Sequence, residues 1–269
     1  MGLGPALLAA LALWSAPAAP PPGAPIPRDA APLASRFAST EQALDAAIDR
    51  WRAAGTSGRP PLDVTLWALY EQRLVIVLTE RRGVADAVLR RLRPAVAKQL
   101  RSELVARRDL GRLSTPRPVS AFRTGPAEPA ASLRSYYLEA QRRFHVAWYV
   151  LAAVNSVESA FDKLRNASTA GAQGPMQFIP STWRAYGLGG DVHDPHDAIF
   201  GAANYLHANG APGDYSRALY RYNPSRLYVD AVLRYARWIR ADPHAYLVLY
   251  SRQVFVRTPR GLVRLTGPK

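Results

Sequence analysis

The sequence contains no cysteine, which excludes disulfide bonds, cysteine-ligated metals, thiol nucleophiles and a lipid-modified N-terminal cysteine. Lysine is nearly absent as well, because only three of the 35 basic residues are lysines and the other 32 are arginines. No hydrophobic run is long enough to cross a bilayer, so we expect no membrane span. Export remains compatible with these absences, since larger domains can be stable without disulfides.

Acidic residues are few relative to basic ones, which gives a formal net charge of +15. Such a charge concentrates a protein near polyanions, and both nucleic acid and an anionic cell wall would fit. The sequence lacks zinc-finger spacing, an RNP-type motif and a basic region that leads into heptads. We therefore expect no nucleic-acid partner. A coding bias towards Ala, Arg, Pro and Gly would explain the arginine content equally well.

The N-terminus has the pattern of an export signal. Residues 5–14 form a short apolar run, and Ala16-Pro17-Ala18 supplies a small-x-small cleavage site. The sequence therefore predicts a signal peptide over residues 1–18 and an exported protein of the cell wall, the extracellular space or the periplasm. One feature is atypical, because no Lys or Arg precedes the apolar run. Residues 19–36 are rich in Pro and Ala and are predicted to form a linker.

Hydrophobic periodicity predicts a mainly α-helical protein. A capping-box pattern at Ser39 and Gln42 indicates the start of the first helix, and Pro94 should break or kink a later one. Near the end of the sequence, alternating apolar residues on both sides of Pro259-Arg260-Gly261 predict a β-hairpin. The predicted segments are a helical region of unknown role over 37–110, a helical catalytic domain over 132–240 and a C-terminal extension over 241–269.

One predicted helix carries an acid beside its apolar face. Apolar residues recur at helical spacing through residues 144–164, and Glu158 lies at the border of this stripe. A partly desolvated carboxyl group has a raised pKa and can donate a proton near neutral pH. A glutamate at such a border is usually solvated or ion-paired, so the position alone indicates little.

Several motifs follow Glu158 in a fixed order. They are Glu158-Ser159, Gly174-Pro175-Met176-Gln177-Phe178, Asp194-Pro195-His196-Asp197, Tyr222-Asn223 and Tyr228-Val229. Their order and spacing closely resemble the lytic transglycosylase domain, a lysozyme-like helical fold, and are nearest to its Gly-Pro-Met-Gln-Phe branch. A generic helical protein would not supply them together. The resemblance covers about residues 135–240 and implies an enzyme that cleaves the glycan strands of peptidoglycan.

The resemblance also implies roles for individual residues. Glu158 matches the catalytic glutamate. Gly174 is expected to let a sugar approach the backbone, and Gln177 to hydrogen bond with it. The Tyr222 hydroxyl is expected to orient the catalytic carboxyl group. Tyr228 is expected near the saccharide, although helix packing would explain it almost as well, and Phe178 is assigned to the core. The residues expected to bind substrate are Ser159, Gly174, Met176, Gln177, Tyr222, Asn223 and Tyr228.

The implied reaction uses a single carboxyl group, whereas most glycosidases use two. Glu158 would protonate the oxygen between MurNAc and GlcNAc, assisted by the acetamido group of the substrate, and a 1,6-anhydro ring would form. The second carboxylate nearest in sequence, Asp162, is interpreted as structural. Two alternatives remain: a muramidase that hydrolyses the same bond, and a non-catalytic peptidoglycan-binding module.

The segment His193-Asp194-Pro195-His196-Asp197 could be drawn as a metal site, but its spacing fits no strong signature. An acid that caps the helix starting near Ala198 explains the carboxylates better. We therefore expect no metal and no cofactor. The expected partners are peptidoglycan glycan strands, with other anionic wall polymers as further candidates.

Overall fold

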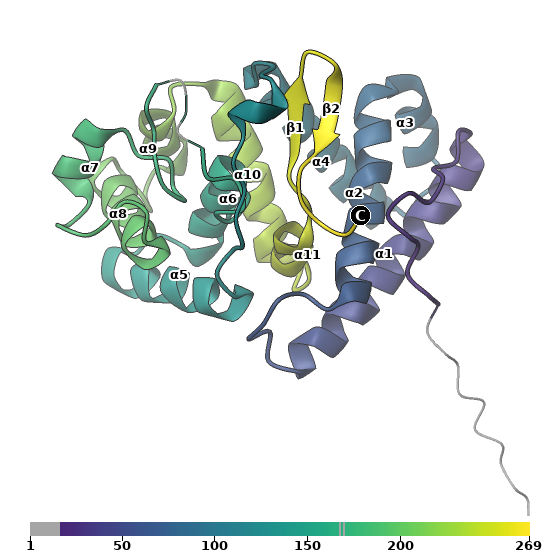
Figure 1. The fold of residues 1–269 in the computed structure, drawn as a ribbon, viewed down its shortest axis with the longest axis horizontal. Helices are drawn as coiled ribbons and strands as arrows, with labels where there is room; N and C mark the ends of the chain where they lie inside the picture. Colours follow the sequence, from purple (N-terminus) through teal and green to yellow (C-terminus); the bar gives the residue numbers. More distant parts are fainter. Residues whose placement is uncertain (1–16, 167, 169) are drawn as a thin grey trace, which may run out of the picture.

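The computed structural model describes residues 17–166, 168 and 170–269, and it shows a mainly α-helical protein as predicted (Figure 1). The predicted signal peptide over residues 1–18 falls largely outside the described residues. In the described chain the helices are α1 (Ala30–Ala53), α2 (Leu62–Glu80), α3 (Arg82–Leu89), α4 (Pro94–Leu113), α5 (Ala130–Phe144), α6 (Trp148–Ser159), α7 (Pro180–Tyr186), α8 (Pro195–Ala208), α9 (Tyr215–Tyr222), α10 (Arg226–Ala241) and α11 (Ala245–Ser251), with a 3-10 turn at Val119–Ala121.

The first helix begins earlier than the capping-box pattern predicted. Helix α1 starts at Ala30, so the end of the predicted linker is helical, and Ser39 lies inside the helix with its hydroxyl donating to the Arg36 carbonyl. Alanine favours helix, and Pro32 is tolerated in the first turn because its missing N–H would have no intrahelical partner there. The predicted break at Pro94 is confirmed, since this proline is the first residue of α4.

The helices of the second half surround a central pair (Figure 1). Helices α6 and α10 pack against each other in the middle of the molecule, while α5, α7, α8 and α9 lie on one side of them. The N-terminal helices α1, α2 and α3 lie on the opposite side, and α4 packs along α10. One hydrophobic core joins both halves, because Leu44, Trp67 and Ala106 belong to the same buried cluster as Val154 and Val232.

The predicted C-terminal hairpin is confirmed. Strands β1 (Phe255–Thr258) and β2 (Gly261–Arg264) pair antiparallel, with Val256 opposite Val263. Gly261 has a φ of 110°, a left-handed conformation that glycine adopts easily and that lets the chain reverse after Pro259-Arg260. The hairpin lies between the N-terminal helices α2 and α3 and the central helix α10 (Figure 1).

A buried ion cluster fixes the C-terminal segment to the N-terminal helices. The Arg252 guanidinium lies 2.8 Å from a Glu71 carboxylate oxygen on α2 and 2.5 Å from a Glu103 oxygen on α4. All three side chains are at most 6% exposed. Next to this cluster, Gln72 exchanges two hydrogen bonds with the Gln253 backbone. Among the described helices, none is long and apolar enough to cross a membrane.

Candidate active site

Glu158 lies in the last turn of α6, and the helix ends directly after it. Ala160, Phe161 and Asp162 all have left-handed backbones, with φ between 51° and 64°. The predicted continuation of this helix to residue 164 is therefore wrong. Phe161, which is fully buried, turns into the core at this point. Because non-glycine residues rarely adopt this conformation, the surrounding packing must hold the segment.

Glu158 is half-buried as a residue, and its carboxyl group is closely surrounded by protein. Burial raises its pKa to about 7. The Tyr228 hydroxyl on α10 donates a hydrogen bond of 2.6 Å to Glu158 Oε1, and this bond lowers the pKa by a smaller amount. Burial and the nearby carboxylate raise the pKa of Tyr228 well above its usual value, so this phenol remains a donor. The carboxyl is thus divided between its acid and base forms near neutral pH.

The residue that orients the carboxyl is Tyr228, whereas sequence analysis assigned this role to Tyr222. The Tyr222 hydroxyl donates instead to the Met176 carbonyl, at 2.6 Å. The Tyr222 ring packs edge-on against Phe178, which is buried in the core as predicted. Asn223 closes α9 with a backbone hydrogen bond to the Leu219 carbonyl, and the turn that it forms leads into α10.

The Gly-Pro-Met-Gln segment forms a tight turn beside the end of α6. Asn155 and Ser159, one helical turn apart, both donate to the Pro175 carbonyl, at 3.3 Å and 2.7 Å. Gly174 has a left-handed φ of 72°, and a Cβ atom there would lie 1.8 Å from the Val192 carbonyl oxygen. The close approach expected at Gly174 is therefore made by the protein backbone itself.

Three of the residues expected to bind substrate are buried: Tyr228, which is 2% exposed, bonds to Glu158, and the other two point into the protein. Ser159 is 1% exposed, and its hydroxyl accepts from the Asp162 backbone while it donates to Pro175. Met176 is fully buried, with its sulfur 3.0 Å from the Asn155 amide nitrogen. In this conformation neither side chain can reach a sugar. Both pack beneath the surface near Glu158, and Asn155 does the same. In the sequence, Asn155 could have been recognised only as a polar residue on a helix expected to be buried.

Gln177 connects this turn to a strap outside the resemblance, residues 117–126. Its side-chain nitrogen donates to the Gly174 carbonyl at 2.9 Å and to the Asn166 carbonyl at 3.1 Å. The Asn166 side chain in turn accepts from the Arg123 backbone at 2.7 Å and donates to the Ala121 carbonyl. Gln177 was among the residues predicted for the site, whereas Asn166 was not. The strap to which Asn166 bonds is distant in sequence, so no local pattern indicated this contact.

Lys163 anchors the same loop to the C-terminal segment. Its ammonium nitrogen donates to the Tyr250 carbonyl at 2.6 Å and to the Arg252 carbonyl at 2.5 Å. Burial lowers the pKa of Lys163 to about 7. The carbonyl of Lys163 also accepts from the Gly125 backbone in the strap. The loop behind Glu158 is therefore held by the strap on one side and by the C-terminal segment on the other.

A comparison with protein-family models gives a match at residues 135–243, to the family described as "Transglycosylase SLT domain". The match contains Glu158, Tyr228 and the turn between them, and its limits are close to the predicted domain 132–240. Residues 135–243 therefore match a transglycosylase SLT domain. No curated protein and no solved structure matches the chain.

The match to this domain indicates lytic transglycosylase activity on peptidoglycan in general. It also agrees with the helical, lysozyme-like architecture expected from the motifs. The strap and residues 250–252 lie outside residues 135–243, yet they bind the loop that follows the Glu158 helix. In this protein the SLT domain is thus braced by segments that are not part of it.

Asp162 is turned to a different environment from Glu158. Its carboxylate lies 3.1 Å from the Arg165 guanidinium, and burial raises its pKa while Arg165 lowers it. It lines a cavity of about 440 Å³ with residues that include Arg123 and Gly174, and Glu158 is not among those lining residues. The left-handed turn at 160–162 also removes it from the helix face that sequence analysis assumed. This geometry agrees with a structural role for Asp162.

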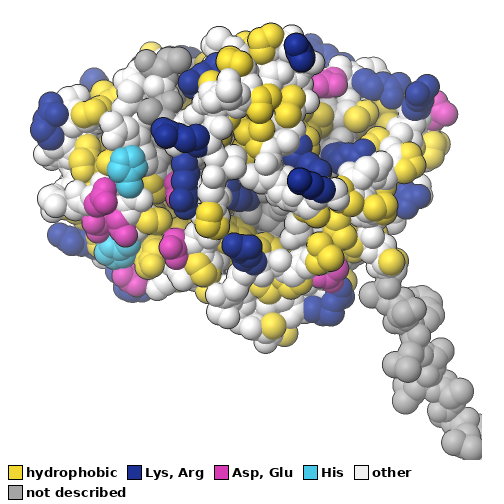
Figure 2. All heavy atoms as spheres, in the orientation of Figure 1, with side chains coloured by type: hydrophobic (Ala, Val, Ile, Leu, Met, Phe, Trp, Pro, Cys, Tyr) yellow, Lys and Arg dark blue, Asp and Glu magenta, His cyan; other side chains and the backbone are white. Residues whose placement is uncertain are grey.

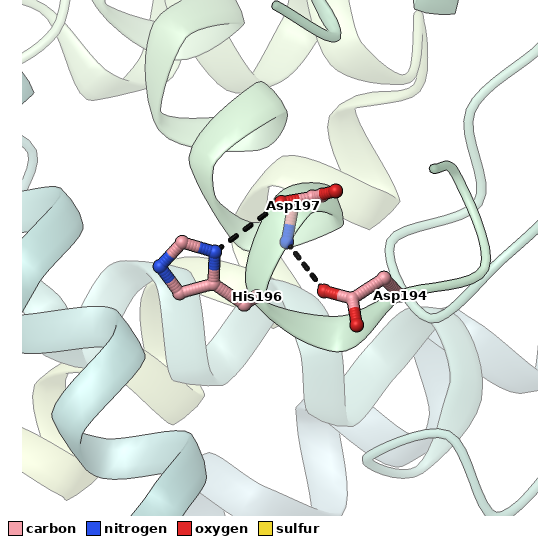
Figure 3. A group of neighbouring side chains, drawn as sticks. All are labelled: Asp194, His196 and Asp197. Carbon is pink, nitrogen blue, oxygen red and sulfur yellow. Dashed lines mark hydrogen bonds and ion pairs between the residues drawn. The ribbon is translucent and has the colours of Figure 1, made fainter. Parts of the chain in front are cut away.

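Figure 3 shows Asp194, His196 and Asp197 at the start of α8 in the SLT domain. One carboxylate oxygen of Asp194 accepts from the Asp197 backbone at 3.0 Å, so the predicted helix cap is confirmed. Asp197 accepts from the Asp191 backbone and lies 3.3 Å from His196 Nδ1. One ligand atom from each of the three lies within 4.8 Å of the others. Helix capping and loop closure already explain the positions of the two carboxylates, so the cluster by itself is not evidence for a metal site.

We expect Tyr228→Phe to raise the pKa of Glu158 above its value of about 7, because the lost hydrogen bond favours the ionised form. A bond to a charged group corresponds to a shift on the order of one pKa unit. The alkaline limb of the pH profile of kcat/KM should move upward by that amount. Tyr222→Phe removes a bond to a backbone carbonyl instead and is the matched control. Equal profiles for the two variants would contradict the orienting role of Tyr228.

Proposed function

We propose that this protein cleaves the β-1,4 bond between MurNAc and GlcNAc with Glu158 as its single acid and base, and that it forms 1,6-anhydroMurNAc. The observation that supports this most directly is the environment of Glu158: one half-buried carboxyl group with a pKa near 7 and a phenol donor at 2.6 Å. Such a group can give a proton and take one back within a single turnover. The nearest acid in sequence, Asp162, is paired with Arg165.

In the proposed reaction, protonated Glu158 donates its proton to the glycosidic oxygen. The bond from this oxygen to C1 of MurNAc breaks, and the carbonyl oxygen of the 2-acetamido group bonds to C1. The Glu158 carboxylate, oriented by Tyr228, then removes the proton of the C6 hydroxyl. O6 attacks C1 and displaces the acetamido oxygen, which closes the anhydro ring and returns the proton to Glu158. No water is consumed, and the effective concentration of the internal hydroxyl favours it over solvent.

Digestion in heavy-oxygen water tests this reaction. We expect the MurNAc ends to be 1,6-anhydro sugars without label from the solvent, as measured by mass spectrometry of the digested peptidoglycan. A hydrolase would instead produce reducing MurNAc ends that carry the heavy oxygen. That result would identify a muramidase, and Asp162 would then be the residue to replace next, while the proton-transfer role of Glu158 could stand.

Export to the cell wall is part of this proposal. It is supported by the signal-like pattern of residues 1–18 and by the location of peptidoglycan outside the cell membrane. Lysine and arginine side chains are spread over the face shown in Figure 2, whereas acids and histidines gather near α8. A dispersed positive charge of this kind suits a large anionic surface better than a single small anion.

Binding of the protein to purified cell walls should therefore depend on salt. We expect the bound fraction to fall steeply as the salt concentration rises towards 0.5 M, where screening acts over roughly 4 Å. A sedimentation assay with walls gives the measurement, and walls stripped of their anionic polymers are the control. Binding that does not change with salt would favour a coding bias as the reason for the arginines.

A further inference from the structure

A cavity of about 760 Å³ lies away from Glu158, between α1, α4 and α10. Its apolar wall includes Leu44, Trp238 and Val248. Helix α10 carries Tyr228 near its start and Trp238 near its end, ten residues later, which separates them by roughly 15 Å along the helix. The cavity is therefore a different site from the one around Glu158, although one helix contributes to both.

Acidic groups occupy one side of this cavity. Glu41 and Asp45 lie one turn apart on α1, so they face the same way. Burial raises the pKa of Glu41 to about 8 and that of Asp45 to about 6, and Asp242 adds to both. Burying two carboxyl groups close together lowers the stability of the fold. Carboxyl groups with strongly raised pKa values are common at functional sites.

Basic groups of α10 line the same cavity and, within the described residues, form no ion pair with Glu41 or Asp45. Arg234, Arg237 and Arg240 project from α10 and line the same cavity. Within the described residues, Asp45 forms one ion pair, with His244 at 3.7 Å, and Glu41 forms none. The buried Nε atom of Arg234 has no hydrogen-bond partner there. Asp242, the C-cap residue of α10, lines the cavity as well, so groups of both signs border one partly apolar space.

We propose that this cavity binds a small zwitterion with an apolar body, such as the end of a short peptide. Its ammonium group would lie beside Glu41 and Asp45, its carboxylate beside the α10 arginines, and its side chain against Trp238. A simple cation would leave the arginines unused, and a simple anion would leave the carboxyl groups unused. The inference is independent of the chemistry proposed for Glu158, because none of these side chains contacts that residue.

Calorimetric titration of the whole protein with the dipeptide leucyl-alanine tests the proposal. We expect measurable binding of the free dipeptide and at least tenfold weaker binding of its N-acetylated form, which lacks the ammonium group. The C-terminally amidated form, which lacks the carboxylate, should also bind at least tenfold more weakly. Lack of binding of the free dipeptide at 10 mM would overturn the proposal, and so would equal binding of all three forms.

Two substitutions locate the binding within the protein. Glu41→Gln keeps the shape of the side chain, and we expect it to weaken dipeptide binding at least tenfold, as should Arg237→Gln on the opposite wall. Glu80→Gln, at the far end of α2, is the matched control. Thermal melting of each variant shows whether the fold is intact, and lysis of peptidoglycan should stay at the wild-type rate. Unchanged binding in folded Glu41→Gln would place the ligand elsewhere and overturn the assignment.

Discussion

Glu158→Gln is expected to reduce peptidoglycan lysis by roughly 10²–10⁴-fold, the usual contribution of a positioned general acid or base. The amide retains the shape of the side chain and can still accept the Tyr228 hydrogen bond, so the site should stay assembled. It cannot deliver a proton to the leaving oxygen. The measurement is release of soluble muropeptides from purified walls, with wall binding measured in parallel. Loss of lysis with retained binding would also exclude a module that only binds the wall.

Two controls separate the loss of a proton from the loss of a fold. The folded-state pKa of Glu158, about 7, lies above the ordinary glutamate value of 4.5, so folding becomes less favourable as pH rises through this range. The glutamine variant lacks this penalty, and its Tm at pH 8 should be at least that of the wild type. Asp162→Asn is the second control, and it should retain most activity. Wild-type lysis by the Glu158 variant would remove this residue from the mechanism.

Arg252→Met is expected to cost about 3–5 kcal/mol of unfolding free energy, because it leaves buried acids without their partner. Glu71 and Glu103 are each at most 4% exposed and both contact this guanidinium. Burial raises the pKa of Glu71 to about 7 even with Arg252 present. Without the arginine the carboxylates must either ionise unpaired or take up protons. Chemical denaturation followed by circular dichroism gives the measurement.

The loss of unfolding free energy in Arg252→Met should be larger at high pH than at low pH. Because the folded-state pKa of Glu71 is raised, its protonated form is stable in the fold at low pH, and stability falls as pH rises through that pKa. We therefore expect a larger loss at pH 8 than at pH 5. Arg257→Met on strand β1 is the matched control. Within the described residues this exposed side chain makes one hydrogen bond, to the Gly111 carbonyl, so the change should alter stability by less than about 0.5 kcal/mol. A similar loss in both variants would mean that the buried cluster is not the cause.

The sequence predicted the helical class, the hairpin and the break at Pro94, because each depends on local periodicity or backbone chemistry. Helix ends were harder to predict. Helix α1 begins at Ala30, where no capping side chain marks the start. Helix α6 stops at Ser159 although the apolar spacing continues to Phe161. The stop comes from three left-handed residues whose cause is tertiary, namely the burial of Phe161 and the bonds to Ser159 and Lys163.

The sequence predicted which residues lie in the candidate site better than it predicted which of them contact one another. The motifs located Glu158, Gln177 and both tyrosines on the correct segments. They could not decide which tyrosine bonds to the acid, because Tyr222 and Tyr228 flank a single turn and both side chains point toward the end of α6. That choice depends on how α10 packs against α6. The supporting contacts of Lys163 join segments far apart in sequence, where no periodicity relates them.

The hydrogen bonds that hold Lys163 can form only late in the synthesis of the chain. A ribosome makes α6, with Glu158, well before it makes Tyr250 and Arg252, whose carbonyl groups hold the loop that follows. A chain ending at residue 243, the limit of the family match, would contain all the motif residues from Glu158 to Tyr228. It would still lack both acceptors for Lys163 and the guanidinium between Glu71 and Glu103. A fragment that has all the motifs therefore still lacks bonds that hold the loop after Glu158, and these bonds can form only after residues 250–252 have been synthesised.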